Sequence, residues 1–514
     1  MSDSPLPAAA PAPAEDRLDR ALMLVASVVV LGTIMSILDV TVVNVAISTL
    51  AREFDSELTT IQWVATGYTL ALATVIPLTG WAADRFGTKR LYMLSIALFV
   101  GGSVLSGFAW SAGSLIAFRV LQGLGGGMIM PAGMTILTRA AGPTRIGRVM
   151  AVIGVPMLLG PVFGPIIGGW MVDHLSWRWI FFINLPIGIA ALFMAARILP
   201  RDVPAPHLRL DVLGLALLSP SLAAIIYGLA ETGEAGGFGS AKVLVPLLAG
   251  LAVLALFVRH ALRADDPLID LRLFANKTFA ASSATLVLAI VALFGGMLLM
   301  PLYLQLVRGE SAFDTGLLLA PQGLGAMITM PLAGRLADRT GVGRIAPVGL
   351  FLIGLAFLAL TQLTAETSYW VLGATLFLMG MGMGATMMPI FSGAMQTLRA
   401  AAVARASTTL NINQQVGASI GTAVLSVLLA TALADRLGGG GGIGGAGAVP
   451  REVRERLAPL MAEAFASTFW WALALVAVAF VVAIVLLPKD KPEPVSDPAA
   501  DAESAEARVP VLAH

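Results

Sequence analysis

The chain of 514 residues contains no cysteine, only four histidines and only 12% charged residues. Without cysteine it forms neither a disulfide nor a thiolate metal site, and the histidines are too scattered to predict a metal cluster. A formal net charge of +1, with no concentrated basic face, argues against nucleic acid as a partner. These absences exclude disulfide-rich domains, most metalloproteins and nucleic-acid-binding proteins.

Catalytic and nucleotide-binding motifs are also missing. The sequence has no GxxxxGK[ST] phosphate loop and no soluble domain large enough to hold one. No nucleophile, base and orienting acid can be assembled at one depth of the chain, so we expect no enzyme activity. If the protein does work, an ion gradient must supply the energy, and no cofactor is expected.

Apolar residues are what the chain does contain, at 57%, with a mean hydropathy of +0.86. A bilayer core of about 30 Å needs about 20 apolar residues per helix, and long continuous runs exclude a β-barrel. The sequence therefore predicts an all-α integral membrane protein with fourteen transmembrane helices. They lie near residues 22–48, 59–82, 91–109, 114–138, 148–171, 179–198, 211–230, 242–262, 279–307, 314–334, 345–363, 369–395, 407–433 and 468–487.

Basic residues gather on the segments that share a side with the N-terminus, which predicts that both termini are cytoplasmic in a bacterial inner membrane. Residues 1–20 and 488–514 are rich in Pro, Ala and acids and are expected to be disordered tails. In the outer loop, residues 434–467, a glycine-rich linker precedes a stretch with helical spacing. That stretch predicts a short helix lying on the outer membrane surface.

An internal repeat divides the chain. GWAADRFGTKR contains Gly80, Asp84, Arg85 and Gly87, and GRLADRTGVGR repeats them as Gly334, Asp338, Arg339 and Gly341. Glycines at these spacings permit a tight helix–loop–helix connection. The duplication predicts two six-helix bundles, residues 21–200 and 266–487, with two inserted helices in residues 201–265. The alternative is that these are simple topogenic loops, which only set the orientation of the helices in the membrane.

The first copy of the repeat resembles the signature loop of the major facilitator superfamily, which latches the two bundles together on the cytoplasmic side. The second copy lacks the adjoining Lys–Arg pair, so its latch is expected to be weaker. The fifth span resembles the antiporter motif of exporters in that superfamily, and the alternative is ordinary small-residue helix packing. The motif residues are Gly154, Gly160, Pro161, Gly164, Pro165, Gly168 and Gly169.

Further strings resemble the fourteen-helix drug:proton antiporter family: LDVTVVNVAI, IQWVATGYTL, SWRWIFFINLPIG and LNINQQVGASIGTAV. The resemblance covers nearly the whole chain. It implies export of small amphiphilic molecules in exchange for protons, with the inserted helix pair peripheral to transport. Some relatives dock on a periplasmic adaptor protein, which nothing in this sequence supports. The alternatives are a dedicated exporter of a secreted metabolite and a metabolite importer or facilitator.

Two charged residues, Asp39 and Arg119, lie deep inside predicted spans. Each costs roughly 2.5 to 3.5 kcal/mol on insertion scales, so such residues usually face a cavity and serve a function. Burial disfavours an ionised carboxylate and a nearby cation favours it, so a carboxylate under both influences can take up and release a proton. We expect Asp39 to carry the proton and Arg119 to assist it; the alternative is that both are structural.

Polar, aromatic and thioether side chains in the spans are the candidates for a substrate cavity. A mixture of this kind suits a small amphiphilic molecule, and flexible thioethers are typical of promiscuous apolar surfaces. The candidates are Gln62, Trp63, Tyr68, Gln122, Gln322, Met387, Asn411 and Gln414. The expected partners are therefore the lipid bilayer, an amphiphilic substrate and protons.

Overall fold

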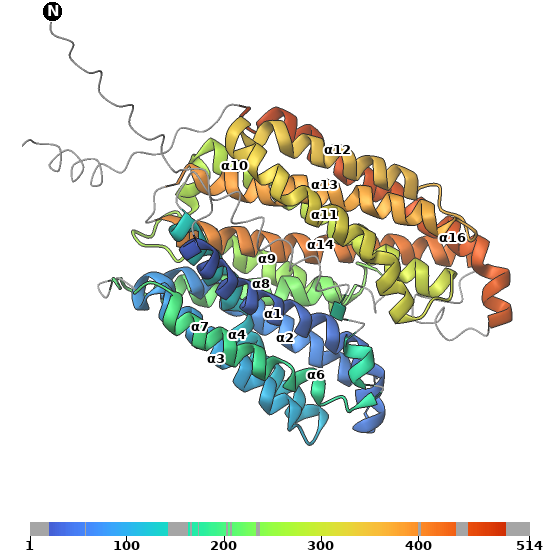
Figure 1. Ribbon diagram of the computed structural model, residues 1–514, viewed down its shortest axis with the longest axis horizontal. Coiled ribbons are helices and arrows are strands. Elements are labelled where there is room, and N and C mark those ends of the chain that lie inside the picture. The colour runs from blue at the N-terminus through green and yellow to red at the C-terminus, as the bar shows by residue number, and fades with distance from the viewer. Residues whose placement is uncertain are drawn as a thin grey trace, which may run out of the picture.

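The computed structural model describes residues 20–56, 58–141, 163–164, 167–172, 174–201, 204–205, 208–232, 237–398, 402–437 and 451–489. Throughout these ranges the regular secondary structure is helical, and no strand occurs in them. Figure 1 shows two groups of long, roughly parallel helices, one from each half of the chain, with α8 and α9 beside the seam between them.

The first bundle contains six described helices. They are α1 (Arg20–Glu53), α2 (Leu58–Phe86), α3 (Thr88–Gly107), α4 (Ala112–Ala141), α6 (Trp179–Phe182) and α7 (Asn184–Ile198). The short α6 and α7 together form one apolar span, Trp179–Ile198. The inserted pair follows as α8 (Val212–Ala230) and α9 (Ala241–Ala261).

The second bundle begins with a short 3-10 helix, η1 (Leu271–Ala275), and a helix that ends in a π-helical turn, η2 (Tyr303–Val307). Its long helices are α10 (Lys277–Leu302), α11 (Ala312–Thr340), α12 (Val342–Leu360), α13 (Tyr369–Gln396), α14 (Val403–Leu437) and α16 (Arg451–Leu486).

Thirteen helices in the described ranges are long and apolar enough to cross a membrane. Each coincides with one of the fourteen predicted spans, which confirms a multi-pass helical membrane protein. The remaining span, 148–171, lies mostly outside the described residues, so the count of fourteen stays a prediction.

The two copies of the sequence repeat form turns of the same shape. Gly87 and Gly341 have φ of 96° and 91°, a left-handed conformation that favours glycine, and each precedes a new helix directly. The matching backbone conformations support the internal duplication inferred from the sequence. We call the side of the molecule that carries both turns the tight-turn end.

The separate surface helix predicted in the outer loop is wrong. α16 runs without interruption from Arg451 to Leu486, so the stretch with helical spacing is the beginning of the last spanning helix. Met461 and Ala464 of this stretch are buried although Leu460 is exposed, and Phe465 packs edge-on against Tyr303 at 5.8 Å between ring centroids. No strong helix breaker separates this stretch from the apolar run, so one helix forms instead of two.

The inserted helices differ in how they pack. Ser219 of α8 donates a hydrogen bond to the Thr74 carbonyl of α2 at 2.6 Å, and Ile225 and Leu229 of α8 cluster with Ala423 of α14. Only 17% of the apolar window of α9 is buried, and α9 packs on α8. Thus α8 contacts a helix from each bundle, and the expectation that the pair is peripheral to transport stays a prediction.

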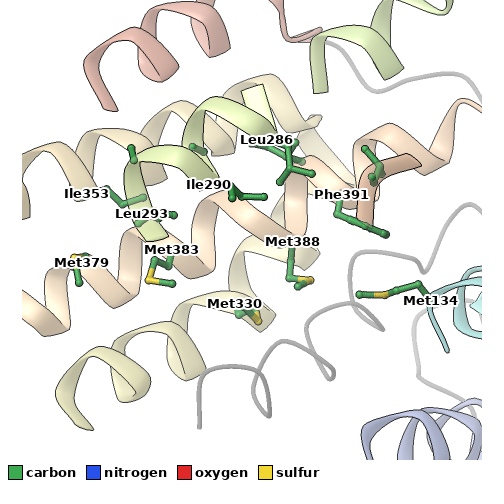
Figure 2. Packing of buried hydrophobic residues seen from close by; sticks show 14 of the residues in the cluster. Met134, Leu286, Ile290, Leu293, Met330, Ile353, Met379, Met383, Met388 and Phe391 are labelled. Carbon is green, nitrogen blue, oxygen red and sulfur yellow. The ribbon is translucent and has the colours of Figure 1, made fainter. Parts of the chain in front are cut away.

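Methionines fill much of the second bundle's core. Met330 of α11 and Met379, Met383 and Met388 of α13 pack with the aliphatic residues of α10, as Figure 2 shows. Met134 of α4 belongs to the same buried cluster, although it comes from the first bundle. The core is thus continuous across the seam.

Candidate functional site

A buried ion pair lies inside the first bundle. The Arg119 Nη1 of α4 donates to the Asp39 Oδ2 of α1 at 2.5 Å, and their side chains are 1% and 0% exposed. They are the only charged side chains classed as buried among the described residues. The structure therefore brings together the two residues singled out from the sequence, which lie 80 positions apart in the chain.

The Arg119 guanidinium has further partners around it. Its Nε donates to the Val64 carbonyl of α2 at 3.2 Å, and its Nη1 also donates to Gln122 Oε1 at 2.8 Å. The guanidinium carbon lies 4.1 Å from the centroid of the Tyr68 ring. An aromatic face attracts a cation, and this attraction is strongest where water is excluded. The site is thus built to hold a positive charge without solvent.

The second oxygen of Asp39 accepts two amide donors. Gln122 Nε2 and Asn184 Nδ2 donate to Asp39 Oδ1 at 2.8 Å and 3.2 Å. The same Asn184 Nδ2 donates to Ser103 Oγ at 3.0 Å, and Ser103 Oγ donates to the Phe181 carbonyl at 2.9 Å. Both carboxylate oxygens are therefore hydrogen-bonded, which buried charge requires.

Close helix packing places these groups. A Cβ on Gly123 would lie 2.5 Å from the Tyr68 carbonyl oxygen, and one on Gly102 would lie 2.6 Å from the Gln122 nitrogen. Only glycine permits α4 to approach α2 and α3 so closely at these points. Gly102 on α3 and Gly123 on α4 therefore let α4 hold Arg119 and Gln122 beside Asp39.

The cluster can do simple acid–base chemistry. Among its buried side chains, the Asp39 carboxyl is the group that can take up a proton, since arginine stays charged and amides do not titrate. Protonation would neutralise Asp39 and leave Arg119 with its carbonyl, amide and aromatic partners. A proton on Asp39 therefore removes the negative charge that strengthens its hydrogen bond from Arg119.

Gly80, in the first copy of the repeat, lies at the seam between the bundles. A Cβ on Gly80 would lie 3.0 Å from Thr408 Oγ1 and 3.4 Å from the Ala404 carbonyl oxygen, both on α14. Nearby, the Arg139 guanidinium of α4 donates to Asp84 Oδ1 at 2.8 Å, with side chains 38% and 15% exposed. Gly80 thus touches the opposite bundle, as a latch requires, while Asp84 ties α2 to α4.

A hydrogen bond joins the two bundles at the same level. Ser407 Oγ of α14 donates to the Pro131 carbonyl of α4 at 3.3 Å. The same carbonyl also accepts from Thr135 Oγ1 within α4 at 2.9 Å. The tight-turn end is therefore closed by direct contact of α2 and α4 with α14.

The remaining latch candidates are only partly placed. Arg85 is half-buried, Gly334 is buried and Arg339 is exposed at the end of α11. The side chain of Asp338 lies outside the described residues.

Only part of the predicted antiporter motif is described. A Cβ on Gly164 would collide with the Thr41 side chain, and one on Gly168 would lie 2.9 Å from Val42 Cγ1. Both contacts are with α1, within three residues of Asp39. Gly169 is half-buried, and Gly154, Gly160, Pro161 and Pro165 lie outside the described residues. The described glycines therefore press against the helix segment that carries the carboxylate.

The described contacts place the candidate cavity residues in separate groups. Tyr68 and Gln122 are buried in the ion-pair cluster. Trp63 is 41% exposed and stacks on Tyr227 of α8 at 5.8 Å between centroids, while the neighbouring Gln62 is half-buried.

The other candidates lie in the second bundle. Gln322 Nε2 contacts Met383 Sδ at 3.2 Å, and Asn411 Nδ2 donates to the Ser407 carbonyl at 2.8 Å. Met387 and Gln414 are half-buried. These residues are spread along α11, α13 and α14, so the described contacts do not assemble them around one point.

Sequence reasoning missed Asn184 as a site residue. It lies within SWRWIFFINLPIG, a string noted above only for its resemblance, and its side chain touches Asp39 directly. The signal was present, because an amide surrounded by apolar residues in a predicted span needs a hydrogen-bond partner.

Comparisons with known proteins agree with this architecture. A family model described as Major Facilitator Superfamily matches residues 29–422. The chain is 49% identical to the Mycobacterium tuberculosis "Multidrug resistance protein B homolog" over 417 residues, 80% of this chain and 77% of the relative. It is 31% identical to the "Multidrug export protein EmrB" of Escherichia coli over 404 residues, 77% of this chain and 78% of that protein.

A solved structure shares the fold. The human organic anion transporter MFSD10 (TETRAN) superimposes with a TM-score of 0.60 at 17% identity, covering 89% of this chain and 100% of the other.

Proposed function

The chain belongs to the major facilitator superfamily, among its multidrug efflux proteins, and from that premise we propose that it exports amphiphilic drugs in exchange for protons. It is a transporter and not an enzyme. In the proposed cycle the two bundles rock about a central substrate, so that the site opens to one side of the membrane at a time.

The observation that carries the proton coupling is the Asp39–Arg119 pair. A buried carboxylate bound to one cation and two amides can exist ionised, and a proton that neutralises it weakens its attraction to Arg119. A proton arriving from the outer side protonates Asp39, and its release to the cytoplasm restores the pair. Binding and release of substrate alternate with these two states.

The nature of the cargo is inferred from the relatives' names and from the second bundle. The printed names of the two bacterial relatives describe multidrug resistance and multidrug export. In the described part of the second bundle no buried side chain is charged, whereas methionines and aliphatic residues are abundant. Flexible methionine side chains can repack around apolar molecules of different shapes.

Orientation follows from charge and from the latch. We place the tight-turn end and both termini on the cytoplasmic side of a bacterial inner membrane, because the positive residues gather there. With this orientation, the contacts that Gly80 and Ser407 make across the seam lie at the cytoplasmic end. Export requires these contacts to separate when substrate enters from the cytoplasm.

Drug uptake into inverted membrane vesicles with an acidic interior tests the proposal. We expect wild-type protein and the control Asp265→Asn, an exposed loop acid, to accumulate a fluorescent lipophilic cation or a neutral drug. Asp39→Asn should abolish accumulation driven by the pH gradient. Undiminished gradient-driven uptake by Asp39→Asn would contradict the coupling role. If the wild type moves none of the compounds, a dedicated metabolite exporter becomes the better assignment.

A further inference from the structure

The hydrogen bonds around Asp39 suit only its ionised form. Oδ2 faces Arg119 Nη1, and Oδ1 faces Gln122 Nε2 and Asn184 Nδ2, so each oxygen meets donors. An ionised carboxylate only accepts, whereas a protonated carboxyl also has a hydroxyl that must donate. Oδ1 already accepts two donors, so a proton there would point at another hydrogen unless one neighbour becomes an acceptor, and no acceptor for a hydroxyl at Oδ2 is described.

Two of the three neighbours, Arg119 and Gln122, cannot accept a hydrogen bond from the new hydroxyl. Arg119 has no acceptor atom. Gln122 Oε1 already accepts from Arg119 Nη1 at 2.8 Å, so reversing that amide would break this bond and turn an NH2 group toward the guanidinium. Neither residue can therefore receive the new hydroxyl.

Asn184 is different because its acceptor is unused. Its Nδ2 donates to both Asp39 and Ser103, while its buried Oδ1 has no hydrogen-bond partner among the residues that the structure describes. Asn184 is 1% exposed, so its side chain is shielded from bulk solvent. An unpaired buried carbonyl beside a carboxylate calls for a physical explanation.

We propose that Asn184 is the positioning residue that responds to the protonation of Asp39, by turning its amide through half a revolution about the Cβ–Cγ bond. The inference rests on the proposed function and refines it. With Asp39 ionised, Nδ2 donates to the carboxylate. With Asp39 protonated, Oδ1 accepts from the new hydroxyl, and only the O–H bond of Asp39 forms or breaks.

The rest of the cluster permits this turn. Reversal exchanges an unpaired Oδ1 for an unpaired Nδ2, so the number of unpaired atoms on Asn184 is unchanged. The Ser103 hydroxyl can rotate from the Phe181 carbonyl toward Asn184 Oδ1, since a hydroxyl both donates and accepts. Asp39 on α1, Ser103 on α3 and Asn184 on α7 therefore change partners together, and protonation alters the contacts among three helices.

Infrared difference spectroscopy of the purified protein in lipid vesicles, recorded across a pH titration, tests the turn directly. We expect the carboxylic C=O band of Asp39 to appear together with a shift of an amide C=O band, at the same midpoint. Asp39→Asn should remove both changes and Asn184→Leu only the amide change. The control Asn413→Leu should remove neither, because Asn413 donates to Ser283.

Transport supplies an independent readout. Asn184→Leu, similar in volume but without polar atoms, should lower proton-driven uptake about tenfold, whereas Asn184→Ser, which both donates and accepts, should stay within about threefold of wild type. An Asp39 band that titrates while the Asn184 amide stays silent would refute the inference alone. Titration of both bands without drug transport would refute only the proposed function, and no titrating Asp39 band would overturn both.

Discussion

Asp39 and Arg119 lie buried in the first bundle, whereas no charged side chain is classed as buried among the described side chains of the second bundle, which exclude those of residues 312, 338 and 451–455. Yet the two halves share tight turns of the same shape at Gly87 and Gly341. Among the described side chains, the turns are alike in the two bundles while the buried charges lie in the first. We infer that the first bundle handles the proton and that the second contributes mainly apolar surface for the substrate.

Removing Arg119 should have the largest effect on stability. Arg119→Leu leaves a buried carboxylate without its cation, which costs about 3–5 kcal/mol. In the second bundle, Gln322→Leu removes only the contact of an uncharged amide with Met383 and should cost about 1 kcal/mol. Thermal unfolding in detergent compares the two variants.

The double variant Asp39→Asn with Arg119→Leu sharpens this contrast. It should be more stable than Arg119→Leu alone, because no unpaired charge remains. Equal destabilisation by Arg119→Leu and Gln322→Leu would show that the two interiors do not differ as described.

The latch variant should have the next largest effect. Gly80→Leu forces a side chain against α14 and should favour separation of the tight-turn end by about 1–3 kcal/mol. Since the chain contains no cysteine, Ala404→Cys gives a single reporter thiol at this contact. Its labelling rate should rise several-fold in the Gly80→Leu background.

Gly101→Leu is the matched control, since a Cβ there would meet nothing within 4 Å. It should leave the Ala404→Cys labelling rate unchanged. The same labelling rate in both backgrounds would mean that Gly80 does not hold the bundles together.

Substitutions on the two inserted helices should differ in their cost to stability, and this difference is smaller than the preceding effects. Tyr227→Leu removes the stack of α8 on Trp63 and should cost about 0.5–1.5 kcal/mol. Leu256→Ala on the exposed face of α9 should cost less, because that side chain is 55% exposed. Thermal unfolding of both variants distinguishes them, and an equal or larger cost for Leu256→Ala would argue against a bridging role for α8.

The smallest effect concerns pH at the start of α8. Burial raises the pKa of Asp211, but hydrogen bonds from Gly214, His260 and Leu268 outweigh it and hold that pKa below its ordinary value of 3.8. The stabilisation is therefore complete above pH 3.8 and is lost as the pH falls through the lower folded-state value. Unfolding followed against pH should show this loss in wild type and not in Asp211→Asn.

The sequence was sufficient for some features and ambiguous for others. Asp39 and Arg119 stand out because charge inside an apolar run is costly, but their contact depends on how α1 and α4 pack. Tyr68 and Gln122 were assigned to a cavity, since a polar residue in a span can line a cavity or join a buried network. Asn184 drew no attention because it carries no charge.

Helix boundaries show a similar limit. The spans follow from the length of apolar runs, whereas the burial of the first part of α16, where Phe465 packs on Tyr303, is a tertiary result that the local pattern does not contain. The packing of α8 on both bundles is likewise a tertiary result, because its sequence is apolar all round.

Proton release on drug binding tests the central claim most directly. Purified protein in a weakly buffered solution with a pH indicator should release protons when a lipophilic drug is added, because binding favours the ionised Asp39–Arg119 pair. We predict release from wild type and none from Asp39→Asn. Equal release from the variant, at equal drug binding, would contradict the assignment of Asp39 as the proton carrier.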